Sequence, residues 1–183
     1  MQTQTFQLER CPSPTGRLLI VNDDQGQLRF VDWEDHEARM QRLLARYYKK
    51  THVVLREVTR PSPARRALEA YFGGELAAID SLRTETTGTE FQREVWGALR
   101  GIPTGATLSY GALATKIGRP AAVRAVGLAN GANPIAIVVP CHRVIGANSS
   151  LTGYGGGIER KRWLLQHEGE RAAEGCAALG RGR

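Results

Sequence analysis

The residues best able to do chemistry lie together in the tetrapeptide Pro140-Cys141-His142-Arg143, directly after an apolar run. A cysteine in such a place is most often a small core residue. His142, however, can accept a proton near neutral pH, and the charge of Arg143 favours a thiolate over a thiol. A thiolate is a soft nucleophile that attacks carbon. We therefore predict that Cys141 is a nucleophile and that His142 is its base.

A histidine that acts as a base needs a partner that orients its ring. Glu168, the acid near the end of the last predicted helix, is the candidate to hold His142 by a charged hydrogen bond. Its alternative role is that of a solvated residue at the helix end. His167 points about 100° away from Glu168 on a helix, so we treat His167 as structural. Because adjacent residues of a strand face opposite ways, a relay between Cys141 and His142 requires a turn or a bridging water.

The sequence contains no recognisable metal or phosphate site. Cys11, Cys141 and Cys176 are far apart, and neither CxxC nor HxxxH spacing occurs. The glycine-rich segment 152–157 lacks a P-loop lysine in the required place. We interpret this segment as a mobile loop that closes over a substrate, and we expect neither a metal nor a cofactor.

The composition is that of one ordinary domain or two small ones. The chain has 183 residues, of which 42% are apolar and 23% charged. No run approaches the roughly 18 to 20 consecutive apolar residues of a membrane span, and residues 1–14 lack the apolar core of an export signal. Three scattered cysteines fit a reducing compartment. We therefore expect a cytoplasmic protein.

The net charge of +7 is unevenly distributed. Residues 1–88 hold 13 basic and 12 acidic residues and are almost neutral, whereas no Asp or Glu occurs between Glu94 and Glu159. A polyanion such as DNA would meet no like-charge repulsion from this acid-free stretch. DNA binding is one interpretation, and an ordinary solvated basic surface is the other.

The elements that position these residues begin with an α/β pattern in the first half. Strand-like segments alternate with turn residues, which predicts hairpins. Ser62 as an N-cap and Gly73 as a stop bracket one of two helices. The predicted strands lie at 6–10, 17–21, 28–33 and 52–58, and the predicted helices at 35–48 and 64–72. We interpret this half as a scaffold.

The polar segment 80–89 is the predicted domain boundary. A capping box formed by Thr89 and Gln92 begins a helix directly after it. The last helix, over 158–169, is expected to stop at Gly169. The expected division is a scaffold domain at 1–84, a second domain at 85–169 and a flexible tail at 170–183.

Two short helices in the second half have the pattern of a helix-turn-helix. Ser109 can cap the first, over 110–117, and Gly118 can end it. The second, over 121–130, begins after Pro120 and consists largely of small residues. Such a helix can approach a nucleic-acid backbone closely, but tight packing between helices also favours small residues.

The apolar run 134–139 follows this helix pair. Its length and composition predict a short buried strand or extended segment that leads to Cys141.

Six segments between residues 90 and 169 together resemble the O6-alkylguanine-DNA alkyltransferases, or methylated-DNA–protein-cysteine methyltransferases, of the bacterial Ogt type. They are FQREVW, IPTGATLSYGALA, RPAAVRAVGLANGANP, IVVPCHRVIG, LTGYGGG and KRWLLQHEG. The pair PCHRV and TGYGGG is highly specific, whereas the N-terminal half matches only loosely. The resemblance implies a ribonuclease H-like α/β N-terminal domain and a mostly α C-terminal domain of winged helix-turn-helix type.

The resemblance implies roles for the matching residues. Cys141 would accept the alkyl group, His142 would take its proton through a water, and Glu168 would orient the imidazole. Tyr110 would donate a hydrogen bond to the guanine, and Lys161 would steady the active-site loop. The implied substrate-binding residues are Asn133, Val138, Tyr154, Gly155 and Gly156. The implied DNA-binding residues are Arg124, which would replace the extruded nucleotide in the stack, and Ala122, Ala125, Gly127 and Asn130.

The implied function is DNA repair by a suicide transferase. The protein would move a methyl or larger alkyl group from O6-alkylguanine, and from O4-alkylthymine, to Cys141 in a single turnover. The target base would be flipped out of double-stranded DNA, which the second helix would enter through the minor groove. No cofactor is expected, because the lesion is itself the donor. We expect a monomer, and cooperative binding along DNA stays open.

Two other classes of function stay open from the residues alone. A non-enzymatic helix-turn-helix protein could bind the lesion, in which case Cys141 and Glu168 would be incidental. A cysteine hydrolase could use a Cys-His-Glu triad, and it would then turn over repeatedly without affinity for DNA. The acid-free stretch speaks against the hydrolase.

Overall fold

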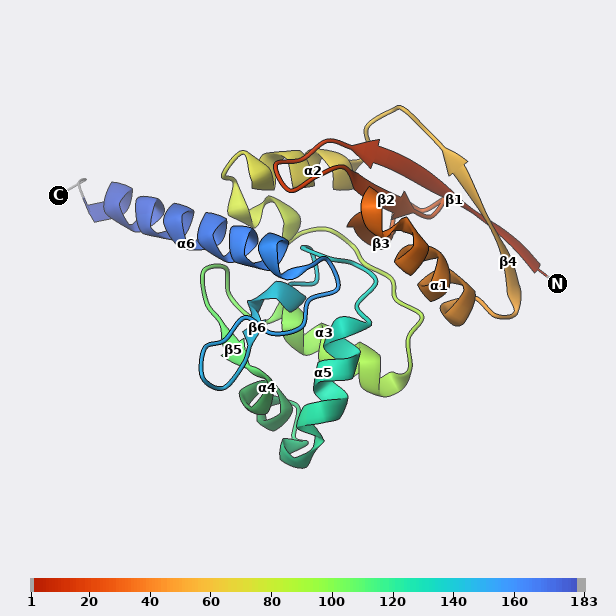
Figure 1. Ribbon diagram of the computed structural model, residues 1–183. Coiled ribbons are helices and arrows are strands. Elements are labelled where there is room, and N and C mark those ends of the chain that lie inside the picture. The colour runs from red at the N-terminus through yellow and green to blue at the C-terminus, as the bar shows by residue number, and fades with distance from the viewer. Residues whose placement is uncertain (1, 181–183) are drawn as a thin grey trace.

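A four-stranded sheet forms the first part of the molecule (Figure 1). This computed structural model describes residues 2–180, and the side chains of residues 3–170. The strands are β1 (Gln2–Cys11), β2 (Leu18–Asn22), β3 (Leu28–Trp33) and β4 (Thr51–Glu57). Their spatial order is β3-β2-β1-β4; β2 is antiparallel to both neighbours, and β4 is parallel to β1. The four predicted strands and the two hairpins are confirmed.

The central strand β2 is buried on both faces, so a hydrophobic cluster lies on each side of the sheet. Leu18 and Ile20 belong to the larger cluster, whereas Leu19 and Val21 belong to the smaller one, as the two-residue period of a strand requires. Helix α1 (Glu37–Tyr47), which the sequence predicts, closes the smaller cluster with its apolar face.

Local capping residues begin the helices that line the larger cluster. At the start of α2 (Pro63–Phe72), the Ser62 hydroxyl accepts a backbone hydrogen bond as predicted. Helix α3 (Glu90–Arg100) opens with the predicted reciprocal capping box between Thr89 and Gln92. The short 3-10 turns of the first half are η1 (Glu34–His36) and η2 (Leu76–Ile79).

The helix-turn-helix pair lies at the lower edge of Figure 1. Helix α4 (Tyr110–Lys116) begins at the predicted cap Ser109, and Gly118 ends it in the left-handed region, with φ of 72°. The second predicted helix divides into a 3-10 turn, η3 (Pro120–Ala122), and α5 (Val123–Gly131). The helices pack against each other and against α3.

The buried strand or extended segment predicted over 134–139 is wrong in its conformation. This run folds into tight turns in which Ile137 has a positive φ of 71°, and only Ile135 forms a single bridge to Val31 of the sheet. The run is buried as expected, but apolar periodicity does not distinguish a buried turn from a buried strand.

This run leads to a 3-10 turn, η4 (Cys141–Arg143), which supplies the turn that a proton relay between Cys141 and His142 requires. Two short strands flank this region, β5 (Leu108–Ser109) and β6 (Val144–Ile145), and they pair in parallel.

The predicted helix stop at Gly169 is also wrong. Helix α6 runs from Ile158 to Gly180, and Gly169 does not take the positive φ of a helix-ending glycine. The helical residues 170–180 include four alanines, two glutamates, an arginine and a leucine, which favour helix and outweigh the two glycines among them. Of the tail predicted to be flexible, residues 170–180 are thus helical and residues 181–183 lie outside the described residues.

The larger hydrophobic cluster crosses the predicted domain boundary without a break. It includes Ile20 of the sheet, Tyr71 of α2, Leu99 of α3 and Cys141. The division near 80–89 stays a prediction, although that segment holds neither helix nor strand. Within the described residues, no helix combines the length and apolar character needed to cross a membrane.

Candidate active site

Cys141 lies at the first residue of η4 and is only 4% exposed. The side-chain amide of Asn133 donates to Cys141 Sγ at 3.0 Å and to the carbonyl oxygen of Val139 at 2.8 Å. Asn130 donates to the carbonyl oxygen of Cys141 at 3.3 Å. Two asparagines at the end of α5 therefore hold the cysteine and the turns before it.

Burial raises the pKa of the Cys141 thiol, and, besides its own backbone, three other residues oppose this effect. They act through the hydrogen bond from Asn133 and the positive charges of Arg39 and Lys161. The sequence singled out Arg143 as the charge that favours the thiolate. In the structure the Arg143 guanidinium instead pairs with Glu168, at 2.9 Å from Nε to Oε2 and 2.8 Å from Nη2 to Oε1.

Glu168 and His142 are both fully buried and contact each other at 2.8 Å between Oε1 and Nε2. Burial alone would raise the pKa of Glu168, but its contacts with His142 and Arg143 outweigh burial and hold that pKa far below its usual range. An ionised carboxylate only accepts hydrogen bonds. Nε2 of His142 therefore carries the proton, and Nδ1 is the basic nitrogen.

His142 is suited to accept a proton. Burial lowers its pKa, an effect that the contact with Glu168 opposes, so the ring is neutral at pH 7. Nδ1 is buried and has no hydrogen-bond partner among the side chains and backbone that the structure describes. A neutral ring with a free Nδ1, directly after Cys141 in the chain, has the form of a general base.

Lys161 and Tyr110 both bind the glycine-rich loop. Lys161 is fully buried, and its Nζ donates to the carbonyl oxygens of Val144 at 2.6 Å and Thr152 at 2.9 Å. The Tyr110 hydroxyl donates to the carbonyl oxygens of Thr152 and Gly153, each at 3.3 Å. The structure thus places both side chains against the loop, and the expected contact of Tyr110 with a guanine stays a prediction.

The predicted loop residues Tyr154, Gly155 and Gly156 lie against the N-terminal half. The Tyr154 ring meets Trp33 edge-on, with 6.0 Å between ring centroids. His36 Nδ1 contacts the Gly155 carbonyl oxygen at 2.8 Å. A Cβ atom at Gly156 would collide with the Trp33 ring, so only glycine allows this approach.

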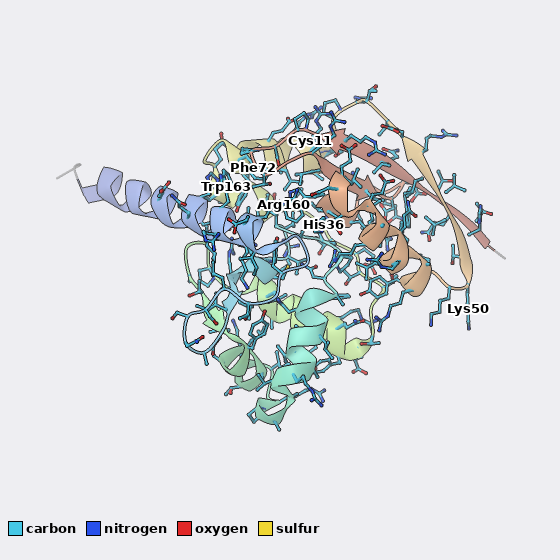
Figure 2. All side chains as sticks on the ribbon, viewed as in Figure 1. Cys11, His36, Lys50, Phe72, Arg160 and Trp163 are labelled. Carbon is cyan, nitrogen blue, oxygen red and sulfur yellow. The ribbon has the colours of Figure 1, made fainter. Side chains whose placement is uncertain are left out.

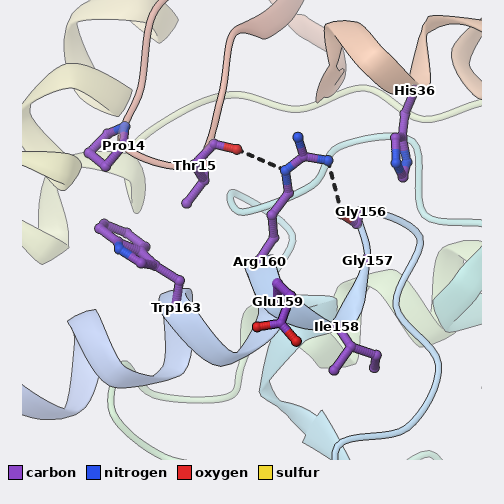
Figure 3. A pocket seen from close by; sticks show the side chains of 9 residues that line it. All are labelled: Pro14, Thr15, His36, Gly156, Gly157, Ile158, Glu159, Arg160 and Trp163. Atoms are coloured by element: carbon purple, nitrogen blue, oxygen red, sulfur yellow. Dashed lines mark hydrogen bonds between the residues drawn. The ribbon is translucent and has the colours of Figure 1, made fainter.

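A groove of about 470 Å³ lies beside this loop (Figure 3). Arg160 bridges it, because its guanidinium donates to the carbonyl oxygens of Thr15 at 2.8 Å and Gly156 at 3.1 Å. The groove is lined by Pro14, Thr15, His36, Gly156, Gly157, Ile158, Glu159, Arg160 and Trp163. Figure 2 places His36 and Arg160 at this junction of the two halves.

The predicted DNA-binding residues do not share one environment. Arg124 and Ala125 are exposed on α5, and Ala122 and Gly127 are half-buried. Asn130 is 2% exposed and holds Cys141, so its predicted place on the DNA-facing surface is corrected. The helical period turns position 130 inward, together with Val126 and Ala129. Val138, one of the implied substrate-binding residues, is buried three residues before the cysteine.

Sequence reasoning missed three residues of the first half. The Tyr71 hydroxyl donates to Glu168 Oε1 at 2.8 Å. Arg39 Nη2 donates to the carbonyl oxygens of Gly131 at 2.8 Å and Asn133 at 3.0 Å, and the Tyr47 hydroxyl donates to that of Ala132 at 2.8 Å. A cation and a hydroxyl thus satisfy the carbonyl groups where α5 ends. Their partners lie more than 80 residues away in sequence, and no local pattern links them.

No cluster of three or more His, Cys, Asp or Glu side chains suited to a metal occurs within the described part of the chain. The unpaired cysteines there are Cys11 and Cys141, and both are buried. Burial and the neighbouring Glu69 raise the pKa of the Cys11 thiol to about 11, which makes it a poor nucleophile.

Comparison with known proteins gives consistent matches over both halves. The family described as 6-O-methylguanine DNA methyltransferase matches with its ribonuclease-like domain at residues 9–86 and its DNA binding domain at residues 90–170. The methylated-DNA–protein-cysteine methyltransferase of Salmonella typhimurium is 54% identical over 88% of this chain and 94% of that protein. The protein of the same name from Methanosarcina acetivorans is 46% identical over 86% and 94% of the two chains.

Solved structures agree with this assignment. The crystal structure of Mycobacterium tuberculosis OGT in complex with DNA has a TM-score of 0.72 and 42% identity, and covers 90% of this chain and 94% of that one. The O6-methylguanine-DNA methyltransferase of the archaeon Pyrococcus kodakaraensis has a TM-score of 0.71 and 26% identity, with 90% and 99% covered. The two-domain architecture expected from the sequence is therefore confirmed, and the chain belongs to the 6-O-methylguanine DNA methyltransferase family.

Proposed function

We propose that this protein transfers the alkyl group of O6-alkylguanine in double-stranded DNA to Sγ of Cys141. One observation carries this proposal: the contact between Glu168 and Nε2 of His142 leaves a basic, buried Nδ1 on the residue that directly follows the buried Cys141. The names of the relatives and the match to the family support the same reaction. O4-alkylthymine is a second substrate of the same class.

The reaction is a single displacement at carbon. His142 Nδ1 takes the thiol proton of Cys141 through a water, and the thiolate attacks the alkyl carbon. The S–C bond forms while the C–O6 bond breaks, and the electron pair moves into the guanine. The Tyr110 hydroxyl donates a hydrogen bond to this leaving group, and the proton held by His142 restores the base.

The product explains why one molecule acts once. S-Alkylcysteine is a thioether, which water does not readily hydrolyse, so Cys141 is not regenerated. The donor is the lesion, and no cofactor enters the reaction. A cytoplasmic location fits this chemistry, because reducing conditions keep the cysteine as a thiol.

The DNA-binding surface is α5 with the preceding helix. Three large apolar side chains are exposed within the described residues, and two of them, Val123 at 39% and Leu128 at 73%, lie on α5. Exposed Arg124 lies between them, in the stretch that lacks acids. An exposed apolar surface beside a single arginine suits the minor groove, where wedging side chains distort the duplex.

The alkyl carbon is hidden inside a duplex, so the target nucleotide leaves the stack before Cys141 reaches it. Arg124 then occupies the gap and offsets part of the extrusion cost, which is a few kcal/mol. The protein binds as a monomer, and cooperative binding along DNA would be an additional property of the same surface. The complex of the M. tuberculosis relative with DNA supports DNA as the partner.

The deciding experiment uses a duplex that carries O6-methylguanine. Intact mass and peptide mapping should locate one methyl group on Cys141 in stoichiometric yield, with unmodified guanine restored. Cys11→Ala is the matched control and should transfer normally, whereas Cys141→Ala should bind DNA without transfer. Bound lesion with unmodified Cys141 would instead indicate a lesion-binding protein, and repeated turnover without DNA affinity would indicate a hydrolase.

A further inference from the structure

Tyr71 of α2 makes two hydrogen bonds to consecutive residues of α6. Its hydroxyl donates to Oε1 of Glu168 at 2.8 Å, and its carbonyl oxygen lies 2.9 Å from Nε2 of His167. Its side chain is fully buried. Two bonds from one residue to neighbouring side chains restrict both the rotation and the sliding of α6 at Glu168.

Aromatic packing reinforces this contact between the halves. The His167 ring stacks on Trp163 with 4.8 Å between centroids, and Phe72 lies 5.8 Å from the Trp163 ring. Figure 2 shows Phe72 and Trp163 together where α2 meets α6. The Tyr71 ring meets His167 edge-on at 5.3 Å. Side chains packed on several sides hold the Tyr71 hydroxyl in one position.

Oε1 of Glu168 accepts three hydrogen bonds. The donors are Nε2 of His142, Nη2 of Arg143 and the hydroxyl of Tyr71, each at 2.8 Å. A carboxylate that accepts more hydrogen bonds is a weaker base. The hydroxyl of Tyr71 therefore reduces the pull of Glu168 on the proton of His142 Nε2.

We propose that Tyr71 is a positioning residue for alkyl transfer, which holds Glu168 so that His142 keeps Nε2 protonated and Nδ1 available to Cys141. This inference rests on the function proposed above. It assigns the N-terminal half a part in the chemistry, because a residue of α2 completes the hydrogen bonding of the carboxylate. Tyr71 acts through Glu168 and His142 and touches no reacting atom.

The direction of the effect follows from the charges around His142. Glu168 opposes the lowering of the His142 pKa that burial causes, whereas Arg143 and Lys161 add to that lowering. Removing the Tyr71 hydroxyl makes Glu168 a stronger base and so raises the pKa of His142. The titratable and charged side chains around His142, on the elements that pack against it, are Tyr71, Cys141, Arg143, Tyr154, Lys161 and Glu168.

The test compares Tyr71→Phe with Tyr48→Phe in the full-length protein. Tyr48 is also a buried tyrosine of the first half, but it packs in the smaller cluster against Phe6 and Phe30. Single-turnover transfer of a methyl group to Cys141 is measured from pH 5 to 8.5, together with affinity for the duplex. The pKa of the His142 ring is measured by nitrogen NMR on the unreacted protein.

For Tyr71→Phe, the pH of half-maximal rate and the pKa of His142 should both rise by about half to one unit. Below that pH the rate should fall about three- to tenfold, because less His142 is neutral. Affinity for DNA should not change, and Tyr48→Phe should match the wild type throughout. A fluorinated tyrosine at position 71, which is a stronger donor and keeps the packing, should shift both values in the opposite direction.

The alternative outcomes are distinct. Transfer by the wild type, with equal pH profiles and equal His142 pKa values in all variants, would overturn the role of Tyr71. A rate loss in Tyr71→Phe that is equal at every pH, without a change in the His142 pKa, would assign it a purely structural role and also overturn the proposal. Absence of transfer by the wild type would overturn the proposed function, and the NMR comparison would still test the contact with Glu168.

Discussion

The side-chain amide of Asn133 donates a hydrogen bond to Sγ of Cys141 at 3.0 Å. Both side chains are buried, so water does not solvate the sulfur. Burial favours the neutral thiol, and this bond favours the thiolate. The same asparagine ties the buried turn that delivers the cysteine through the Val139 carbonyl group. One residue therefore links the end of α5, the helix proposed to bind DNA, to the state of the nucleophile.

Asn133→Ala should slow alkyl transfer, because the pKa of Cys141 rises further when only burial and distant charges act on it. The fold loss should be the same at every pH well below the pKa of Cys141 and should shrink only as the pH approaches that pKa. A buried carbonyl group left without its donor costs about 1 to 3 kcal/mol of stability. Single-turnover rates against pH and urea unfolding measure the two effects. Asn148→Ala, in an exposed turn, is the control and should change neither.

Glu168→Gln should remove a stability component that depends on pH. The folded pKa of Glu168 lies far below its unfolded value, so its contribution is fully present above about pH 5 and is lost as pH falls toward the folded pKa. At pH 7 the variant should lose roughly 3 to 5 kcal/mol, since Arg143 stays buried without its anion.

Urea unfolding at pH 7, 5 and 3 checks this expectation. The difference in free energy of unfolding between wild type and Glu168→Gln should become smaller toward pH 3. Glu159→Gln, whose carboxylate is 86% exposed, provides the control. If this difference in free energy of unfolding stays constant from pH 7 to pH 3, the charge of Glu168 does not cause the loss of stability.

Arg124→Ala should slow repair in a duplex about tenfold, because the side chain no longer offsets part of the extrusion cost. Transfer from free O6-benzylguanine should change much less, since no nucleotide leaves a stack. Rates on the two substrates give the comparison. Arg162→Ala, at an exposed position of α6, should affect neither. An equal loss on duplex and free base would contradict the role of Arg124 in the stack.

Lys161→Met should loosen the glycine-rich loop, because the Val144 and Thr152 carbonyl groups lose their shared donor. We expect a loss of about 1 to 3 kcal/mol in stability and faster amide exchange at 152–157. Urea unfolding and hydrogen exchange measure these changes. Lys116→Met is the matched control, because Lys116 is exposed and donates to one carbonyl group at the surface. Unchanged exchange in the loop would argue against its attachment by Lys161.

Elements with local signals could be predicted from the sequence. The caps at Ser62, Thr89 and Ser109 act within three residues, so the chain nearby is sufficient to define where α2, α3 and α4 begin. Strand β2 likewise follows from its own continuous apolar run, which is buried on both faces of the sheet. By contrast, the turns at 134–139 and the continuation of α6 beyond Gly169 depend on competition between several allowed conformations.

The sequence by itself was enough to predict Cys141 as the reactive group, because His142 follows it and the family motifs surround both. It also predicted the helix pair proposed to bind DNA and showed that acids are absent between Glu94 and Glu159. Only the tertiary structure decided which charges act on the site. Arg143 neutralises Glu168 instead of activating the thiol, and Arg39 and Tyr71 reach the site from the other half. Folding brings together Tyr71 and Glu168, which are 97 residues apart, and burial then makes each charge and hydrogen bond decisive.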